Sequence, residues 1–270
     1  MGDYKVCRDT ESVNHTSIMC HSLFVDYGQT MRVGVYVDAF NLYYGMRAHC
    51  GRGTAGWRWL DIRALSNELC GWKDATVTRV VYCTARVDAT DSPSAHTDQN
   101  IYLRALKEHG SIDVLELGRY VAWPKVAPLA HKAPNGAAEI ITPDGTALPN
   151  HLPIWEKDDN TMYLAQVRMR EEKGSDVNVA TYLLADVFRG EVDAAIVISN
   201  DSDLALPLTI ARTLVPVGTV NPSKKPLAGA LHGSASEGPG RHWWSRLSPK
   251  HFYRNQMPNT VGPLYKPADW

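Results

Sequence analysis

Short apolar runs alternate with amphipathic stretches between residues 31 and 221. The β-branched runs predict strands at 32–37, 76–83, 112–118, 194–199 and 215–220. Apolar residues at helical spacing predict helices at about 61–70, 95–109, 176–188 and 204–213. An alternation of strand and helix is typical of a parallel sheet with right-handed crossovers. The pattern therefore predicts an α/β domain over residues 31–221 with a central, mostly parallel sheet.

The helix predicted from Asp176 has the clearest periodicity in the chain. Its apolar face consists of Ala180, Leu183, Leu184, Val187 and Phe188. Asp176 lies one turn before Ala180 on that same face, so its side chain is expected to point inward at the start of the helix.

Three segments break the alternation. Residues 1–30 are polar and aperiodic, which predicts a weakly ordered leader. Residues 120–160 contain six prolines and the turn pairs Asn135-Gly136 and Asp144-Gly145, which predict a surface β-hairpin inserted into the domain. Residues 222–270 contain seven basic and two acidic residues, a net charge of +5 within a chain of net charge −1. They are expected to form a basic, aromatic C-terminal extension.

Composition narrows the class of protein. The chain has 270 residues, 44% of them hydrophobic, which is ample for a buried core. It contains no apolar run of about 18 residues, so no membrane partner is expected, and no signal peptide is evident. Its five cysteines are scattered without a C-x-x-C pair, which favours reduced thiols and a cytoplasmic location over structural zinc.

Four acidic residues stand at strand or helix boundaries: Asp38, Asp176, Asp201 and Asp203. The carboxyl ends of parallel strands lie along one edge of a sheet, so these carboxylates are expected to converge there. At about 4 Å and an effective dielectric of about 20, each pair of charges costs about 4 kcal/mol. A divalent cation removes that repulsion, and all-oxygen ligand sets suit Mg²⁺ or Mn²⁺. One such Asp taken alone is better explained as a turn or helix-cap residue, whereas four at matched element ends favour metal binding.

Four neighbouring polar residues are candidates for a supporting role. Asn41, three residues after Asp38, can orient a water or a phosphate oxygen, or can cap the first helix. Lys173 can contact Asp176 or a scissile phosphate, and otherwise is a solvated lysine. Ser199 and Ser202 can donate hydrogen bonds to the carboxylates, or simply form turns.

Three segments together resemble the NYN-domain nucleases, a branch of the PIN-like ribonuclease superfamily. They are VDAFNLYY, with Asn three residues after Asp; EEKGSDVNVA, with its Lys-Gly-x-Asp; and ISNDSDL, with its S-x-D-x-D. Ala39 departs from the Gly common after the first Asp. The resemblance covers about residues 32–221. It implies a three-layer PIN-like fold and a metal-dependent ribonuclease, an endonuclease rather than an exonuclease, that leaves a 5′-phosphate and a 3′-hydroxyl.

Other chemistries find less support. The chain contains no H-E-x-x-H, G-x-S-x-G, G-x-G-x-x-G or Walker A motif. A haloacid-dehalogenase-like phosphatase needs a second Asp two residues after the first, where this chain has Phe40. The alternative that stays open is an inert module that keeps the fold and binds RNA or a protein partner without turnover.

The extension combines aromatic with basic residues. Its candidate RNA-binding residues are Arg241, Trp243, Trp244, Arg246, Lys250 and Arg254. Aromatic rings can stack on unpaired bases while cations follow the phosphates, which points to single-stranded RNA as the partner. Alternatively, the aromatic residues pack the extension onto the domain. Ser248 and Pro249 predict a helix start there. The sequence does not determine the oligomeric state, and a homodimer is one of the assemblies it allows.

Overall fold

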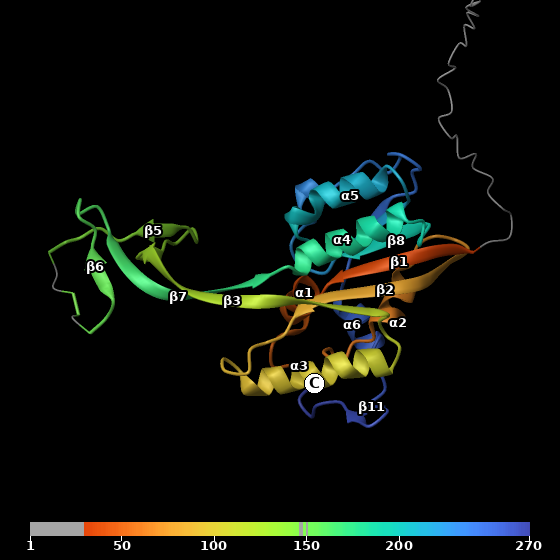
Figure 1. The fold of residues 1–270 in the computed structure, drawn as a ribbon, viewed down its shortest axis with the longest axis horizontal. Coiled ribbons are helices and arrows are strands. Elements are labelled where there is room, and N and C mark those ends of the chain that lie inside the picture. The colour runs from red at the N-terminus through yellow and green to blue at the C-terminus, as the bar shows by residue number, and fades with distance from the viewer. Residues whose placement is uncertain (1–29, 146–147, 150) are drawn as a thin grey trace, which may run out of the picture.

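A computed structural model of the chain describes residues 30–145, 148, 149 and 151–270. The leader predicted at 1–30 lies outside the described residues except for its last position. The chain forms a three-layer α/β fold around one large sheet, which confirms the predicted fold class (Figure 1). Among the described residues, no helix is both long and apolar enough to cross a membrane.

The main sheet has eight strands in the order β10-β9-β8-β1-β2-β3-β7-β6. Its strands are β1 (Met31–Asp38), β2 (Ala75–Ala85), β3 (Val114–Pro128), β6 (Ile154–Glu156), β7 (Tyr163–Lys173), β8 (Ala194–Ile198), β9 (Val217–Asn221) and β10 (Trp243–Arg246). Neighbours from β10 to β3 pair in parallel, whereas β3 with β7 and β7 with β6 pair antiparallel. The five strands predicted from the sequence are β1, β2, β3, β8 and β9.

Helices cover both faces of the sheet. The helices are α1 (Ala39–Cys50), α2 (Ile62–Leu69), α3 (Pro93–Glu108), α4 (Ser175–Phe188), α5 (Ala205–Arg212) and α6 (Pro249–Arg254), with the 3₁₀ turns η1 (Ser202–Leu204) and η2 (Gly229–Leu231). Side chains of α1, α2, α3 and α6 form one buried core against the sheet. Side chains of α4 and α5 form a second core on the opposite face. All four helices predicted from the sequence are present.

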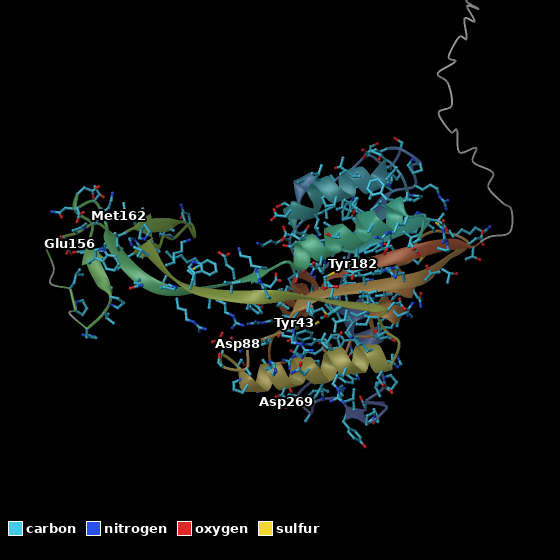
Figure 2. All side chains as sticks on the ribbon, viewed as in Figure 1. Tyr43, Asp88, Glu156, Met162, Tyr182 and Asp269 are labelled. Carbon is cyan, nitrogen blue, oxygen red and sulfur yellow. The ribbon has the colours of Figure 1, made fainter. Side chains whose placement is uncertain are left out.

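Strands β3 and β7 leave the body of the molecule together as a long antiparallel ribbon. Beyond Gly118, β3 has no pairing with β2 and pairs only with β7. The outer end of the ribbon carries β6 and a small sheet of β4 (Ala130–Lys132) and β5 (Ala138–Ile140). Glu156 and Met162 mark this outer end in Figure 2.

The predicted hairpin at 120–160 is therefore part of a longer structure, which begins with β3 and returns through β7. Its prolines do not end β3, because a residue without an N–H is tolerated on an open strand edge. Pro124 and Pro128 both lie in register with β7, opposite Arg168 and Leu164.

The C-terminal residues are built into the body of the molecule. Strand β10 extends the parallel sheet beyond β9, and Phe252 of α6 is fully buried in the first core. Ser248 caps α6 in a capping box with His251, as the Ser-Pro pair predicts. The short strands β11 (Thr260–Val261) and β12 (Leu264–Tyr265) pair near α3.

Candidate metal site

Asp38 ends β1 and caps α1. One carboxylate oxygen accepts the backbone N–H of Asn41 at 3.0 Å, and the other accepts the Ser199 hydroxyl at 2.8 Å. The side chain is buried, with 3% of the residue exposed. Burial raises the pKa of Asp38, and the charges of Asp201 and Glu172 raise it further, while the two hydrogen bonds act in the opposite direction. Asp38 is thus held in one position and is costly to ionise.

Asp201 follows β8 on the neighbouring strand. Its backbone N–H donates to the Ser199 hydroxyl oxygen at 3.1 Å, and its carboxylate accepts the N–H of Asp203 at 3.0 Å. Ser199 therefore connects two of the acids: it accepts from Asp201 and donates to Asp38. The role expected of Ser199, supporting the carboxylates through hydrogen bonds, matches this placement.

Asp176 lies in the first turn of α4, the helix that packs on the opposite face of the sheet from α1. Gly174, with φ of +102°, makes the turn that precedes the helix, a conformation that glycine adopts without strain. The pKa of Asp176 is raised to about 7, first by burial and then by the charges of Asp38, Asp201, Glu172 and Asp203. Without a cation, this carboxyl therefore takes up a proton at a higher pH than an ordinary aspartate.

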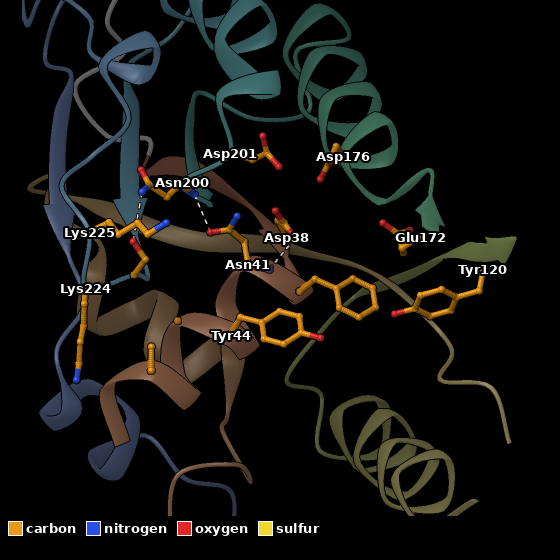
Figure 3. A pocket seen from close by; sticks show the side chains of 14 residues that line it. Asp38, Asn41, Tyr44, Tyr120, Glu172, Asp176, Asn200, Asp201, Lys224 and Lys225 are labelled. Atoms are coloured by element: carbon orange, nitrogen blue, oxygen red, sulfur yellow. Dashed lines mark hydrogen bonds between the residues drawn. The ribbon is translucent and has the colours of Figure 1, made fainter. Parts of the chain in front are cut away.

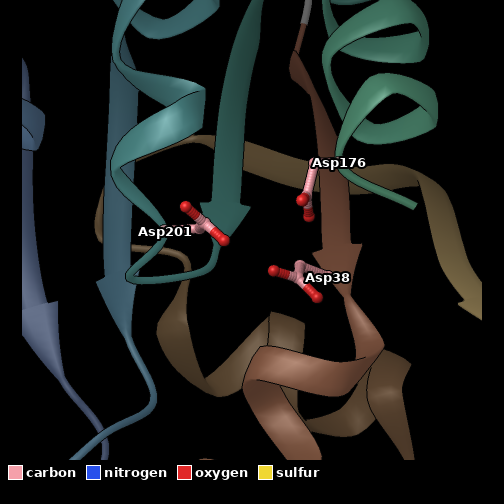
Figure 4. A group of neighbouring side chains, drawn as sticks. All are labelled: Asp38, Asp176 and Asp201. Atoms are coloured by element: carbon pink, nitrogen blue, oxygen red, sulfur yellow. The ribbon is translucent and has the colours of Figure 1, made fainter. Parts of the chain in front are cut away.

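Asp38, Asp176 and Asp201 form a group that we call the acidic triad. One oxygen from each lies within 4.8 Å of the others, and Figure 4 shows the three side chains meeting at the ends of β1, β8 and the start of α4. Among the described residues, none of the three forms an ion pair with a basic side chain. An all-oxygen set with uncompensated repulsion suits a hard divalent cation such as Mg²⁺ or Mn²⁺.

The structure places Asp203 and Ser202 outside this group. Asp201 caps η1, so the two residues that follow turn away on the 3₁₀ turn, and both are exposed. Asp203 lies with Asp176 at a smaller, mostly apolar groove between α4 and α5. Its charge still contributes to the raised pKa of Asp176.

Asn41 connects the triad, through Asn200, to the loop that follows β9. Its side-chain oxygen accepts the backbone N–H of Asn200 at 3.0 Å. The Asn200 amide donates to Ser223 and to the carbonyl of Pro226, at 3.3 and 3.1 Å. Asn41 is not the helix cap, because Asp38 occupies that position.

Glu172 is a cleft residue that the sequence did not single out. It ends β7 beside the triad, and its carboxylate accepts the N–H and the hydroxyl of Ser175 at 3.2 and 2.8 Å, which fixes the start of α4. Lys173, singled out instead, is exposed and pairs with Glu171. No sequence signal marked it, since Glu-x-x-Ser is the reverse of the Ser-x-x-Glu order of a capping box.

These side chains line an open cleft of about 700 Å³ (Figure 3). Asp38, Asp176, Asp201 and Glu172 form its acidic centre. Phe40, Tyr44 and Tyr120 lie on one side, and Lys224 and Lys225 on the other. None of these aromatic residues and neither lysine was a candidate from the sequence as a member of the site.

The candidate RNA-binding residues of the extension divide into two groups. Trp243 packs against Trp72, with ring centroids 5.4 Å apart, so the packing alternative holds for it. Trp244 is exposed, as are Arg241, Arg246, Lys250 and Arg254. Arg254 pairs with Glu68 at 2.9 Å. None of the six lines the cleft.

Comparison with known proteins gives few relatives. No family model matches the chain. It is 28% identical over 216 residues to 6-hydroxy-3-succinoylpyridine 3-monooxygenase HspA of Pseudomonas putida, a match that covers 72% of this chain. The match covers 61% of that protein's length. A crystal structure of a protein of unknown function from Vibrio parahaemolyticus aligns with 83% of this chain and 96% of its own, at 14% identity and a TM-score of 0.43.

Proposed function

We propose that the chain is a divalent-metal-dependent ribonuclease of the NYN, PIN-like kind, which hydrolyses phosphodiester bonds in RNA. The observation that carries the proposal is the acidic triad, in which three carboxylates from three separate elements lie within 4.8 Å. Such crowding is unfavourable without a cation, because burial and the neighbouring carboxylates raise the pKa of Asp38 and of Asp176. Perturbed pKa values gathered in a cleft are typical of functional sites, and a divalent cation would offset the repulsion.

Asp38, Asp176 and Asp201 would hold Mg²⁺ or Mn²⁺. When bound, such an ion lowers the pKa of a water and offsets the negative charge that develops on the phosphoryl group. Asp38 is kept in place by Ser199 and by the start of α1, so it contributes a fixed ligand position. Glu172 fixes the start of α4 and through it the position of Asp176.

Asn41 and the cleft lysines would contact the substrate's phosphates. In the proposed reaction a water oxygen attacks the phosphorus and the 3′ oxygen leaves. The products then carry a 5′-phosphate and a 3′-hydroxyl, as the NYN resemblance implies. Because the cleft is open, a strand can cross it without a free end, which favours endonuclease action.

The test is cleavage of a circular single-stranded RNA in Mn²⁺. The expected result is conversion to linear products, complete inhibition by EDTA, and recovery on adding excess Mn²⁺. A circle that stays intact while a linear RNA is shortened would indicate an exonuclease. If neither RNA is cleaved under these conditions but RNA is bound, the chain is the inert binding module that the sequence left open.

A second candidate rests on the similarity to the Pseudomonas monooxygenase. In that case the cleft would hold a small aromatic acid, with its ring beside Tyr44 and its carboxylate at the lysines. The discriminating assay mixes the protein with 6-hydroxy-3-succinoylpyridine, dioxygen and a two-electron reductant. Substrate loss that requires all three would favour this candidate over the ribonuclease.

Cellular location and assembly belong to the same proposal. Cys50, Cys70 and Cys83 carry free thiols, which suits a reducing compartment, and we propose the cytoplasm. A homodimer is the assembly to test first by light scattering, because the protruding ribbon carries exposed apolar residues such as Val126 and Val167.

A further inference from the structure

The two sides of the cleft differ in chemistry. Phe40 and Tyr44 lie one turn apart on α1, and Tyr120 lies opposite them at the root of the ribbon. Lys224 and Lys225 lie across the acidic triad from Tyr120, with the Lys225 side chain directed toward Asn41 and the Lys224 side chain directed away from the triad (Figure 3). A ligand that spans the cleft therefore meets rings at one end, carboxylates in the middle and cations at the other.

Tyr44 is the ring available for a ligand. Phe40 meets Tyr120 edge to face at 6.0 Å, and the guanidinium of Arg170 lies 4.0 Å from the centre of the Tyr120 ring. Those contacts occupy Phe40 and Tyr120, which form a wall. Tyr44 contacts Tyr43 at its edge, and 57% of it is exposed at the cleft.

Lys224 and Lys225 are exposed, but their backbone is fixed. The Asn221 side chain accepts the N–H of Ser223 and donates to the carbonyl of Lys225, both at 2.8 Å. Asn200 ties the same loop to the triad through its bonds to Ser223. Among the described residues, neither lysine forms an ion pair with a carboxylate. Both cations are thus available to an anionic ligand.

We propose that the cleft binds single-stranded RNA with one unpaired base on the Tyr44 ring and a neighbouring phosphate on Lys224 and Lys225, an inference that rests on the proposed ribonuclease function. Stacking on an aromatic ring needs a base free of its partner, so a duplex is a poor ligand. The lysines neutralise a phosphate on the far side of the scissile bond. Recognition is assigned to the cleft, which includes Lys224 and Lys225, and not to the basic and aromatic residues at 241–254 of the C-terminal extension.

Binding is measured by fluorescence anisotropy with a labelled oligouridylate, in Ca²⁺, using the Asp201→Asn background to prevent cleavage. Tyr44→Ala is expected to weaken binding about ten-fold, the scale of one lost base stack, whereas Tyr44→Phe keeps it. Tyr265→Ala is the matched control, since Tyr265 is an exposed tyrosine on β12, outside the cleft. An oligomer with abasic sites in place of its bases is expected to bind Tyr44→Ala and its parent equally.

The lysines are tested by salt dependence. Lys225→Gln is expected to reduce the log–log slope of affinity against salt by about 0.7, the value for one phosphate contact on a single strand. Lys250→Gln, a change in α6 outside the cleft, is expected to leave the slope unchanged. The opposite pattern, with the slope falling only for Lys250→Gln, would overturn the assignment of recognition to the cleft.

The outcomes separate this inference from the ribonuclease proposal. Cleavage by the wild type together with wild-type oligouridylate affinity in Tyr44→Ala overturns the inference alone. Absence of any metal-dependent cleavage by the wild type overturns the ribonuclease proposal, whatever the binding shows. A third outcome is that the oligomers do not bind, while nicotinate binds and its affinity falls in Tyr44→Ala. The Tyr44 ring would then serve a small aromatic acid, and the inference is overturned.

Discussion

The acidic triad joins three carboxylates in unequal surroundings. Asp38 is buried and hydrogen-bonded on both oxygens, whereas Asp176 and Asp201 are partly exposed. For Asp176, burial and the neighbouring charges act in the same direction, and its pKa rises to about 7. Asp176 is therefore the member of the triad whose protonation a bound cation is expected to change most.

The metal-free protein is predicted to lose stability as pH rises from about 4 to about 8, between the ordinary pKa of an aspartate and the raised pKa of Asp176. Folded Asp176 keeps a proton up to a pKa of about 7, while the unfolded chain releases it near the ordinary value of 3.8. In that window the folded state binds more protons, so raising the pH favours unfolding. The raised pKa of Asp38 acts in the same direction. Thermal melts in EDTA across this range measure the effect.

Asp176→Asn is the control for that pH dependence. It removes the titrating group, so the metal-free melting temperature should rise at about pH 8 and its pH dependence should flatten. The increase in melting temperature that Mn²⁺ gives the wild type should shrink at the same time. A pH profile identical to the wild type would contradict the raised pKa of Asp176.

Asp201→Asn is predicted to abolish metal-dependent cleavage while the fold is kept. The change removes one ligand charge at nearly constant volume, and a loss of about 100-fold or more in activity is expected. Asp203→Asn is the matched comparison, since Asp203 is exposed and outside the triad. Initial rates over a Mn²⁺ titration measure both variants. An equal loss of cleavage activity in both variants would mean that Asp203 is also a metal ligand.

At the scale of elements, Asp186 of α4 connects the helix to the sheet beneath it. The residue is buried, with 2% exposed, and accepts the Tyr36 hydroxyl at 3.0 Å and the Arg79 side chain at 2.6 Å. Burial, and then the charge of Asp186, raises the pKa of Tyr36 well above its usual range. This contact fixes α4 on β1 and β2, and so fixes the helix that carries Asp176.

Asp186→Ala is predicted to lower the free energy of unfolding by about 2–3 kcal/mol, because the buried Tyr36 hydroxyl and the partly exposed Arg79 both lose their partner. Tyr36→Phe should cost only about 1 kcal/mol, the net value of one hydrogen bond. Asp193→Ala provides an exposed control: its pair with Arg32 on the surface should contribute less than about 1 kcal/mol. Urea denaturation measures all three. A cost for Asp186→Ala no larger than for Asp193→Ala would contradict the structural role.

The sequence predicted the strands and helices whose apolar runs or stripes are buried in the two cores. Strand β8 is apolar throughout because helices cover both of its faces, and Asp38 and Asp201 follow from strand ends that parallel pairing aligns. The length of the β3–β7 ribbon could not be predicted, because an exposed ribbon has no buried stripe and its prolines resemble loop signals. Strand β10 was missed because a short edge strand with Ser245 and Arg246 lacks an apolar run.

At the scale of the whole molecule, the C-terminal extension is a structural part of the domain. It adds β10 to the edge of the sheet and supplies Leu247, Phe252 and Met257 to the first core. The indole of Trp59 donates to the carbonyl of Pro258 at 2.7 Å. The positive charge of residues 222–270 is therefore carried on a folded surface and not on a separate tail.

Truncation after residue 240 is predicted to destroy cooperative unfolding. It would expose the edge of β9 and the buried rings of Trp57 and Trp59, which the C-terminal residues help to cover.

Loss of Phe252 alone removes a fully buried ring, and Phe252→Ala should lower the free energy of unfolding by about 3–5 kcal/mol. Trp244→Ala changes an exposed ring on the same segment and should shift stability by less than about 0.5 kcal/mol. Thermal and urea melts followed by near-UV circular dichroism test the series. A truncated chain that melts as sharply as the full one would mean that residues 241–270 are an independent appendage, and the role of RNA-binding tail would then be the better account of its basic residues.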